Sequence, residues 1–197
     1  MQPLPVSFFE QIKDGACGAA AFEMVFRYYR PSRSLNFSQM KLFKKQRERE
    51  PHGSGSYRIT TEELVTVAQN KRFHAGWGRV SPDAVILAQQ VRHFVETEQV
   101  PLIACQRYTD AEYTIGHFRV ITGIDDKAIQ FHDPCPKTGG ESIVWPLNRF
   151  IDHWKQTGQN VTGGVAIWIA KSPFKNNPLL PDLPNPWDHH QWRPANA

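Results

Sequence analysis

The chain has 197 residues, of which 40% are hydrophobic and 12% aromatic, and its formal net charge is +4. That length and apolar content suit one folded domain, with or without a tail. Its longest apolar runs are about six residues, too short for a membrane span, and a pI near 9.0 permits contacts with anions without requiring them.

Cysteine usage and the start of the chain bear on location. The three cysteines, Cys17, Cys105 and Cys135, are an odd number without a Cys-x-x-Cys pair, so we expect no disulfide framework and a reducing compartment. Residues 1–10 have neither a positive stretch nor a long apolar run, so no secretory signal is predicted. The expected location is the cytoplasm, or another cell reached by a signal-peptide-independent route.

The first strong element is a helix over residues 17–30. Its apolar side chains fall on two sides and leave only a narrow polar strip, which is typical of a central, mostly buried helix. Pro31 ends it, and Asp14 and Gly15 precede it. Cys17 is therefore expected in the first turn of this helix.

Three further helices are predicted before residue 101. Ser81-Pro82-Asp83 opens one of them, with proline at the first helical position, and it is expected to run to about Glu98. Val85, Ala88, Val91 and Val95 are expected on one side of this helix. One of the other two helices covers 38–49, and the second begins near Thr61, with Thr60 or Thr61 as N-cap. Breaks are predicted at 51–56 and at Gly76-Trp77-Gly78.

After Pro101 the pattern changes to that of strands. Residues 117–124 read as one strand of a hairpin, 125–127 as its turn and 128–133 as the returning strand. Other strands are predicted over 102–105, 142–145 and 164–170, with a short helix over 147–155.

The order of these elements predicts an α+β chain, with an N-terminal helical lobe and a C-terminal antiparallel sheet lobe. We expect the domain to comprise residues 1–171. Residues 172–197 are rich in proline and lack periodicity, and we interpret them as a tail, extended or packed over the domain.

Cys17 is the first candidate for chemistry. A lone cysteine is most often a small buried apolar residue. A helix N-terminus, however, lowers the pKa of a thiol because unpaired N–H groups and the helix dipole favour the thiolate. Gly15 and Gly18 flank the residue and leave room for a substrate backbone beside the sulfur.

His117 and Asp133 are placed at the two ends of the predicted hairpin. Because the ends of a hairpin are adjacent, the two side chains could meet, and a carboxylate there would fix one imidazole tautomer and favour its cation. The alternative for Asp133 is ordinary turn chemistry, since Asp-Pro often follows a strand.

Gln11 lies six residues before Cys17. A glutamine at such a position is unremarkable by itself. Its side-chain amide could nevertheless donate a hydrogen bond to an oxyanion that forms at the sulfur, together with the backbone N–H of Cys17.

Together, three segments resemble the bacteriocin-processing cysteine peptidases, papain-like domains that cut leader peptides after Gly-Gly. These segments are Gln11-Ile-Lys-Asp-Gly-Ala-Cys17-Gly18, Gly116-His-Phe-Arg-Val-Ile-Thr-Gly-Ile124 and His132-Asp-Pro134. The resemblance covers roughly residues 6–170. It departs from the family where Gly-Ala-Cys-Gly-Ala replaces an Asp-Cys-Gly-Pro type of run, and from these residues we expect neither the membrane spans nor the ATPase of the processing exporters.

The resemblance implies a papain-like cysteine protease fold in which the helix bearing the cysteine is central. It implies Cys17 as nucleophile, His117 as general base and acid, Asp133 as the orienting group and Gln11 as oxyanion donor. The expected reaction is cleavage of a protein or peptide at or after Gly-Gly, with no metal and no other cofactor.

Two related functional hypotheses involve the same catalytic residues. Stand-alone domains of this kind also occur as bacterial effectors or toxins that cleave proteins in another cell, which would imply an inhibitor or immunity protein as partner. The same acyl-enzyme could instead serve an acyl or peptidyl transferase. A non-catalytic peptide-binding module is the alternative from another class.

Two weaker candidates remain. Cys105, His132 and Cys135 could bind zinc, but their spacing is poor for that metal. The basic run Lys41, Lys44, Lys45, Arg47 and Arg49 is interleaved with glutamates, so we interpret it as a solvated helix face and do not expect a nucleic-acid partner.

Overall fold

The computed structural model describes residues 1–31, 59–109, 116–155, 163–174 and 176–179, together with Gln39 and Leu42. The predicted helix over 38–49 and the loop over 51–56 lie outside the described residues, except for positions 39 and 42. The described elements are α1 (Cys17–Tyr29), α3 (Thr61–Asn70), β1 (His74–Arg79), α4 (Ala84–Arg92), the π-helix η1 (His93–Thr97), β2 (Leu102–Arg107), β3 (Gly116–Ile124), β4 (Ala128–His132), β5 (Ile143–Pro146), α5 (Leu147–Lys155) and β6 (Val165–Ala170).

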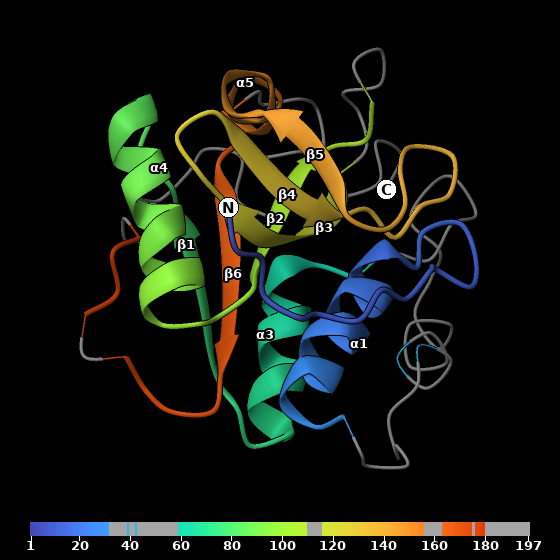
Figure 1. Ribbon diagram of the computed structural model, residues 1–197. Coiled ribbons are helices and arrows are strands. Elements are labelled where there is room, and N and C mark those ends of the chain that lie inside the picture. The colour runs from blue at the N-terminus through green and yellow to red at the C-terminus, as the bar shows by residue number, and fades with distance from the viewer. Residues whose placement is uncertain are drawn as a thin grey trace, which may run out of the picture.

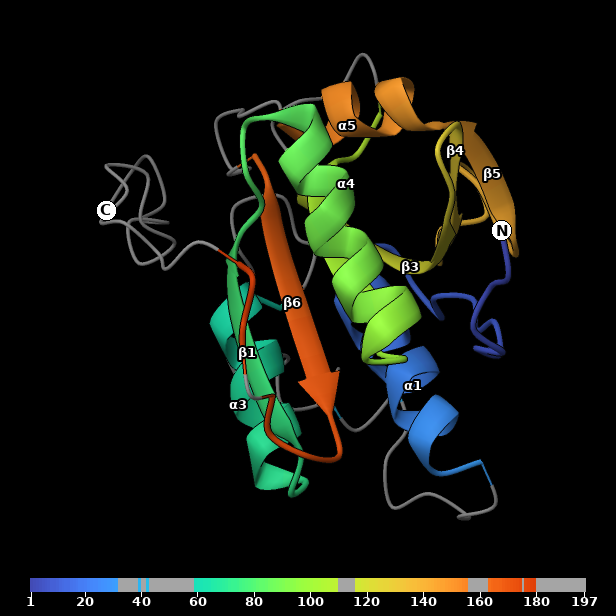
Figure 2. The same ribbon diagram turned by 60° about the vertical axis from the view of Figure 1, so that its left-hand side comes forward.

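The described strands form one antiparallel sheet in the order β1-β6-β2-β3-β4-β5. Figure 1 shows α1 and α3 side by side below strands β2 to β5, with α5 above them. Turned by 60°, the same ribbon shows β1 and β6 running together at the other end of the sheet, with α3 beside β1 (Figure 2). This arrangement confirms the α+β class.

α1 is the predicted central helix. It begins at Cys17, and every residue from Cys17 to Phe26 is buried. Its N-cap, Ala16, offers no side-chain acceptor, so the first N–H groups of the helix remain available to another partner. Gly15, with φ of 83°, turns the chain into the helix in a conformation that favours glycine. α1 packs against β3 and so brings the sulfur to that strand.

The hairpin of β3 and β4 also forms as predicted. The Asp125 carboxylate accepts hydrogen bonds from the backbone N–H groups of Lys127 and Ala128, which closes the turn. Nearly every residue of β3 is buried, so both faces of the strand are covered. Polar side chains on this strand therefore need partners inside the protein, and His117 and Arg119 have them.

The prediction of a break at Gly76-Trp77-Gly78 is wrong, because these residues lie in β1, which pairs with β6. A Cβ atom at Gly76 would lie 2.8 Å from Cζ2 of Trp168, its partner across the ladder. The glycine thus marks a close approach of an indole to the strand and does not end the strand. The helical first half of the chain consequently contributes an edge strand to the sheet.

The helix predicted from Ser81 begins later than expected. Asp83 is the N-cap of α4, and its carboxylate accepts from the N–H groups of Val85 and Ile86, so Pro82 precedes the helix. Of the four apolar residues expected on one side, Ala88, Val91 and Val95 are buried, whereas Val85 is 67% exposed. The buried side includes Leu87, Val91 and Phe94, and the helix continues into η1 as far as Thr97.

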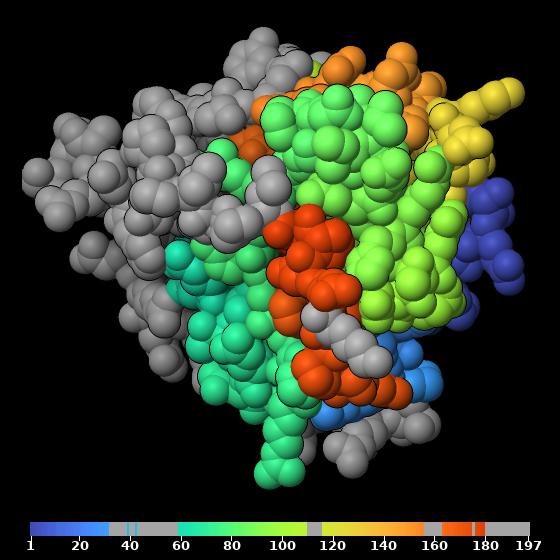
Figure 3. All heavy atoms as spheres, turned by 90° about the vertical axis from the view of Figure 1, so that its left-hand side faces the viewer, coloured from blue at the N-terminus to red at the C-terminus, as the bar shows by residue number. Residues whose placement is uncertain are grey.

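The described part of the segment after β6 packs against the domain. Gln90 donates a hydrogen bond to the carbonyl of Pro178, Leu179 is buried, and the ring of Phe174 contacts those of Phe94 and Trp168. Figure 3 shows this segment on the surface next to α4.

In the part of the chain that the structure describes, no helix combines the length and apolar character that crossing a membrane requires.

Candidate active site

Cys17 lies at the first residue of α1 and is 8% exposed. Its sulfur hydrogen-bonds to the imidazole of His117 and to the backbone N–H groups of Gly18 and Phe118. The first of these N–H groups belongs to the unpaired start of the helix, and the second belongs to β3. Packing of α1 on β3 therefore assembles the surroundings of the sulfur from two distant parts of the chain.

His117 is the second residue of β3 and is 2% exposed. Its Nε2 lies 2.6 Å from Oδ1 of Asp133. Because an ionised carboxylate can only accept, Nε2 carries the proton and Nδ1 is left to face the sulfur. The ring of Tyr108 meets the imidazole edge-on, with 5.3 Å between the centroids.

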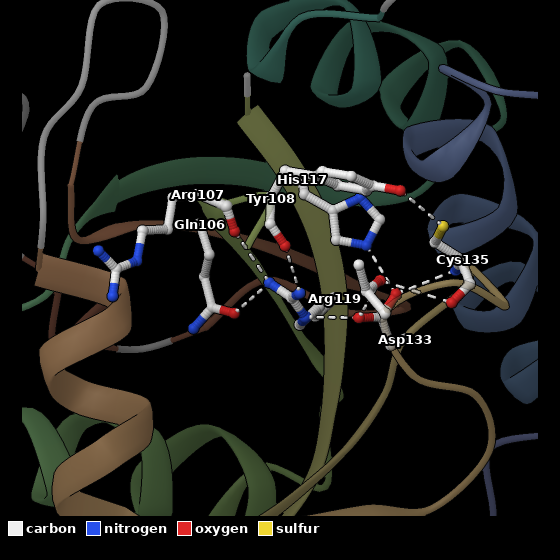
Figure 4. A network of polar contacts seen from close by, with 8 residues as sticks. Gln106, Arg107, Tyr108, His117, Arg119, Asp133 and Cys135 are labelled. Carbon is white, nitrogen blue, oxygen red and sulfur yellow. Dashed lines mark hydrogen bonds and ion pairs between the residues drawn. The ribbon is translucent and has the colours of Figure 1, made fainter. Parts of the chain in front are cut away.

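Asp133 follows β4 directly and is fully buried. Its Oδ1 also accepts from the backbone N–H of Cys135 at 3.0 Å, and its Oδ2 accepts from Thr138 Oγ1 at 2.9 Å and from Arg119 Nε at 2.8 Å. Both carboxylate oxygens are thus occupied (Figure 4). A buried carboxylate with this many donors is held in one orientation.

Electrostatics favour an ion pair between the sulfur and the ring. Burial raises the pKa of the Cys17 thiol, but the charge and hydrogen bond of His117 and the two N–H groups outweigh it, so the net pKa is below the ordinary 9.0. Burial lowers the pKa of His117 and the charge of Arg119 does the same. The thiolate of Cys17 and the hydrogen bond to Asp133 outweigh both effects and raise the net pKa above 6.5.

The carboxyl of Asp133 stays ionised. Burial raises its pKa, but the hydrogen bond and charge of His117, the charge of Arg119 and the N–H of Cys135 together bring the pKa well below the ordinary range. The site therefore contains a permanent anion that faces the imidazole from the side opposite the sulfur.

Gln11 lies beside the loop that carries Asp133. Its backbone N–H donates to the carbonyl of Pro134 at 2.9 Å, and its side chain is 9% exposed. The side chain of Gln39 hydrogen-bonds the backbone on both sides of Gln11. Its amide donates to the carbonyl of Glu10, and its oxygen accepts from the N–H of Ile12. Gln11 is therefore held by its neighbours, and its Oε1 has no hydrogen-bond partner among the described residues.

The other two cysteines differ from Cys17. Burial raises the pKa of the Cys105 thiol to about 12, and the nearby Cys17 charge adds to that shift. Cys135 lies 3.3 Å from the hydroxyl of Tyr108. Within the described residues, only Cys17 has an imidazole against its sulfur.

The weak zinc hypothesis has no support in the described residues, among which no group of three or more His, Cys, Asp or Glu side chains could hold a metal ion. His132 uses both ring nitrogens within the protein. Its Nε2 donates to the carbonyl of Val6 at 2.8 Å, and its Nδ1 accepts from the N–H of Ser142 at 2.9 Å.

Sequence reasoning missed the residues that surround the site. Arg119 could have been found, because it lies two positions after His117 and therefore on the same face of the strand. The sequence carries no comparable signal for Thr138 or Gln39. Thr138 lies in an irregular loop, and Gln39 hydrogen-bonds residues that are 27 and 29 positions away along the chain.

Comparisons with known proteins place this geometry in context. The peptidase domain of Streptococcus ComA, a bifunctional ABC transporter involved in quorum sensing, has a TM-score of 0.59 at 18% identity, covering 85% of this chain and 99% of that one. A putative C39-like peptidase from Bacillus anthracis has a TM-score of 0.59 at 13% identity, covering 88% and 100%. A double-glycine-motif protease from an AMS/PCAT transporter, solved with its leader peptide, has a TM-score of 0.53 at 18% identity, covering 85% and 92%.

At such identities the structural likeness shows the fold, which is the predicted papain-like fold of the C39 peptidases. No curated protein matches the chain. The sequence profile of the Peptidase_C39 like family matches residues 3–162, which is most of the chain. The chain therefore belongs to the Peptidase_C39 like family, whose C39 peptidase relatives are cysteine-type hydrolases, as its motifs predicted.

Proposed function

We propose that the chain hydrolyses peptide bonds with Cys17 as nucleophile, His117 as general base and acid, and Asp133 as the orienting carboxylate. The observation that carries this proposal is the continuous hydrogen-bonded path from the sulfur through the imidazole to the carboxylate. The lowered pKa of Cys17 and the raised pKa of His117 support it, because both shifts favour a thiolate beside an imidazolium.

In the first half of the reaction, the thiolate attacks the scissile carbonyl carbon and its π electrons move to the oxygen. The tetrahedral intermediate then collapses: the C–N bond breaks, and the amine leaves with the proton held by His117. The products are a thioester on Cys17, a free amine end and a neutral imidazole.

In the second half, His117 takes a proton from water while the water oxygen attacks the thioester. Collapse of the second tetrahedral intermediate breaks the C–S bond, which releases the carboxylic acid and restores the thiolate beside the imidazolium. The orienting carboxylate of Asp133 holds the ring in one tautomer through both halves and stabilises each imidazolium.

The oxyanion of each intermediate is assigned to the side-chain amide of Gln11 and the backbone N–H of Cys17. The bonds that hold the backbone around Gln11 support this role, because they limit the positions open to its side-chain amide and so reduce the reorganisation needed when charge develops. Since Cys17 begins α1, its own N–H has no partner within the helix.

For the substrate, we propose a peptide with glycines before the scissile bond. The solved double-glycine-motif protease with its leader peptide shares the fold and supports this class of substrate. Glycine has no side chain, so a peptide of this kind could bring its backbone close to a nearly buried sulfur.

The test is to incubate the purified chain with peptides that contain an internal Gly-Gly and to identify the new ends by mass spectrometry. Cys17→Ala is the inactive variant, and Cys105→Ala is the matched control, because it removes a buried thiol without an imidazole. Cleavage that needs Cys17 and tolerates the loss of Cys105 supports the proposal. Products that have gained an added amine in place of water would identify a transferase, and intact peptides would contradict both activities.

A further inference from the structure

Arg119 is a buried arginine that the reaction scheme above does not use. It is 1% exposed, and its guanidinium makes four hydrogen bonds. Burying such a cation is costly unless its N–H groups are satisfied and its charge is paired. Here the paired anion is Asp133, the carboxylate that contacts the imidazole of His117.

The guanidinium ties three parts of the chain together. From β3 it donates to Asp133 in the loop after β4, and it donates to the carbonyls of Arg107 and Tyr108 at the end of β2, at 3.2 and 3.0 Å. A further N–H bonds the Gln106 side chain at 3.0 Å (Figure 4).

Together with two further contacts, these bonds form a closed ring of residues beside the imidazole. The hydroxyl of Tyr108 meets the sulfur of Cys135, and the N–H of Cys135 donates to Asp133, which pairs with Arg119. His117 touches this ring at two points, the Tyr108 ring and the Asp133 carboxylate. Removing Arg119 would therefore loosen both surfaces that hold the imidazole.

A contribution to the stability of the fold does not by itself explain why Arg119 lies beside Asp133 and His117. Buried ion pairs are often replaceable by apolar side chains of similar volume without loss of stability. Arg119 lies on the same face of β3 as His117, two residues away, and shares one carboxylate with it. Its charge also acts on the imidazole directly.

We propose that Arg119 is a positioning residue, whose guanidinium fixes the Asp133 carboxylate and the end of β2 so that His117 faces Cys17. The proposal deepens the function proposed above and rests on it for its effect on catalysis. The charged or titratable groups around the imidazole are Cys17 from α1, Tyr108 after β2, Arg119 on β3 and Asp133 after β4. Of these, Arg119 alone places a positive charge beside the ring.

Two variants separate orientation from charge. Arg119→Met removes the charge and all four donors, whereas Arg119→Lys keeps the charge and loses the planar fork. Arg92→Met is the matched control, because it removes an arginine–aspartate pair at the surface, between Arg92 and Asp126. The readouts are the pH titration midpoint of the His117 imidazole and the exchange rate of its Nε2 proton, both by NMR of the intact chain. His117→Asn identifies the signals.

Arg119→Met is expected to speed exchange of the Nε2 proton at least about tenfold, because the bonds that orient Asp133 are lost, and its midpoint reports the balance between the lost charge and the loosened contacts. In Arg119→Lys we expect an unchanged midpoint but an exchange rate at least about tenfold faster, since charge-assisted bonds that orient Asp133 are lost. Arg92→Met should leave both readouts as in wild type. An unchanged exchange rate in either folded Arg119 variant would overturn the proposal.

If Arg119→Met does not fold, Arg119→Lys and Thr138→Val decide the matter. Thr138 donates to the same carboxylate oxygen as Arg119 but carries no charge, so its loss should speed exchange without moving the midpoint. The NMR readouts need no substrate. Absence of peptide cleavage in the wild type would therefore count against the proposed function alone, and unaltered NMR readouts in the variants would count against Arg119 alone.

Discussion

Nε2 of His117 lies 2.6 Å from Oδ1 of Asp133, although the two residues are 16 positions apart along the chain. The hairpin of β3 and β4 explains the contact, because Val120 pairs with His132 and the ladder directs both residues to the same end of the hairpin. An ionised carboxylate is thereby fixed against an imidazole that contacts the sulfur of Cys17 on its other side.

The first prediction concerns Asp133→Asn. An amide cannot stabilise the imidazolium as a carboxylate does, and it leaves Arg119 as a buried cation without its partner. We expect kcat for a Gly-Gly peptide to fall by at least about 10²-fold. We also expect the free energy of unfolding to fall by about 3–5 kcal/mol. Steady-state kinetics and urea unfolding would measure these changes, and wild-type kcat in a folded variant would contradict the role of Asp133.

The second prediction concerns stability against pH. The folded pKa of Asp133 is below its unfolded value, so its contribution is present above about 3.8 and is lost as the pH falls through the folded pKa. The folded pKa of His117 is above 6.5, so its contribution is complete below 6.5 and is lost as the pH rises through the folded pKa. The melting temperature should fall on the acidic side of this window; on the alkaline side the lowered pKa of Cys17 adds stability with rising pH and opposes the loss at His117. In Asp133→Asn the melting temperature should fall less steeply with decreasing pH than in wild type. Equal slopes in the two proteins would contradict a lowered pKa at Asp133.

The third prediction concerns Gln11→Ala. Loss of one oxyanion donor should lower kcat by about 10²–10³-fold and leave KM nearly unchanged, because the bond forms only when charge develops. Gln69→Ala is a suitable control, since its side chain donates to the Ala75 carbonyl in another part of the fold. A variant that raises KM at constant kcat would instead make Gln11 a substrate-binding residue.

The fourth prediction concerns Gly139→Ala. An added Cβ would lie 2.5 Å from the Cβ of Asp133 and would also meet the side chain of Ile143, so the carboxylate must shift. We expect a loss of about 1–3 kcal/mol in the free energy of unfolding, together with a lower kcat. Gly76→Ala is the matched control, because its Cβ would meet Trp168 at a distant strand. Gly76→Ala should lose stability and keep the kcat of wild type. Equal kcat values in the two folded variants would show that a Cβ at position 139 does not disturb the Asp133 carboxylate.

Much of the site could be predicted from the sequence because local rules decide it. Hairpin length brings Asp133 to His117, and a helix start explains the position of Cys17. The strand β1 was missed because glycine was interpreted as a break, whereas Gly76 admits the indole of Trp168. Arg119 follows the two-residue period of a strand, but its role depends on the burial of both faces of β3, which only the packing of the whole chain decides.

The most direct test of the central claim is the rate at which iodoacetamide alkylates Cys17 at pH 6, compared between wild type and His117→Ala. If the sulfur and imidazole form an ion pair, Cys17 in the wild type should react faster than an ordinary thiol, and the histidine variant should lose that advantage. If Cys17 reacts no faster than an ordinary thiol and His117→Ala has no effect, the two residues do not act as a catalytic unit.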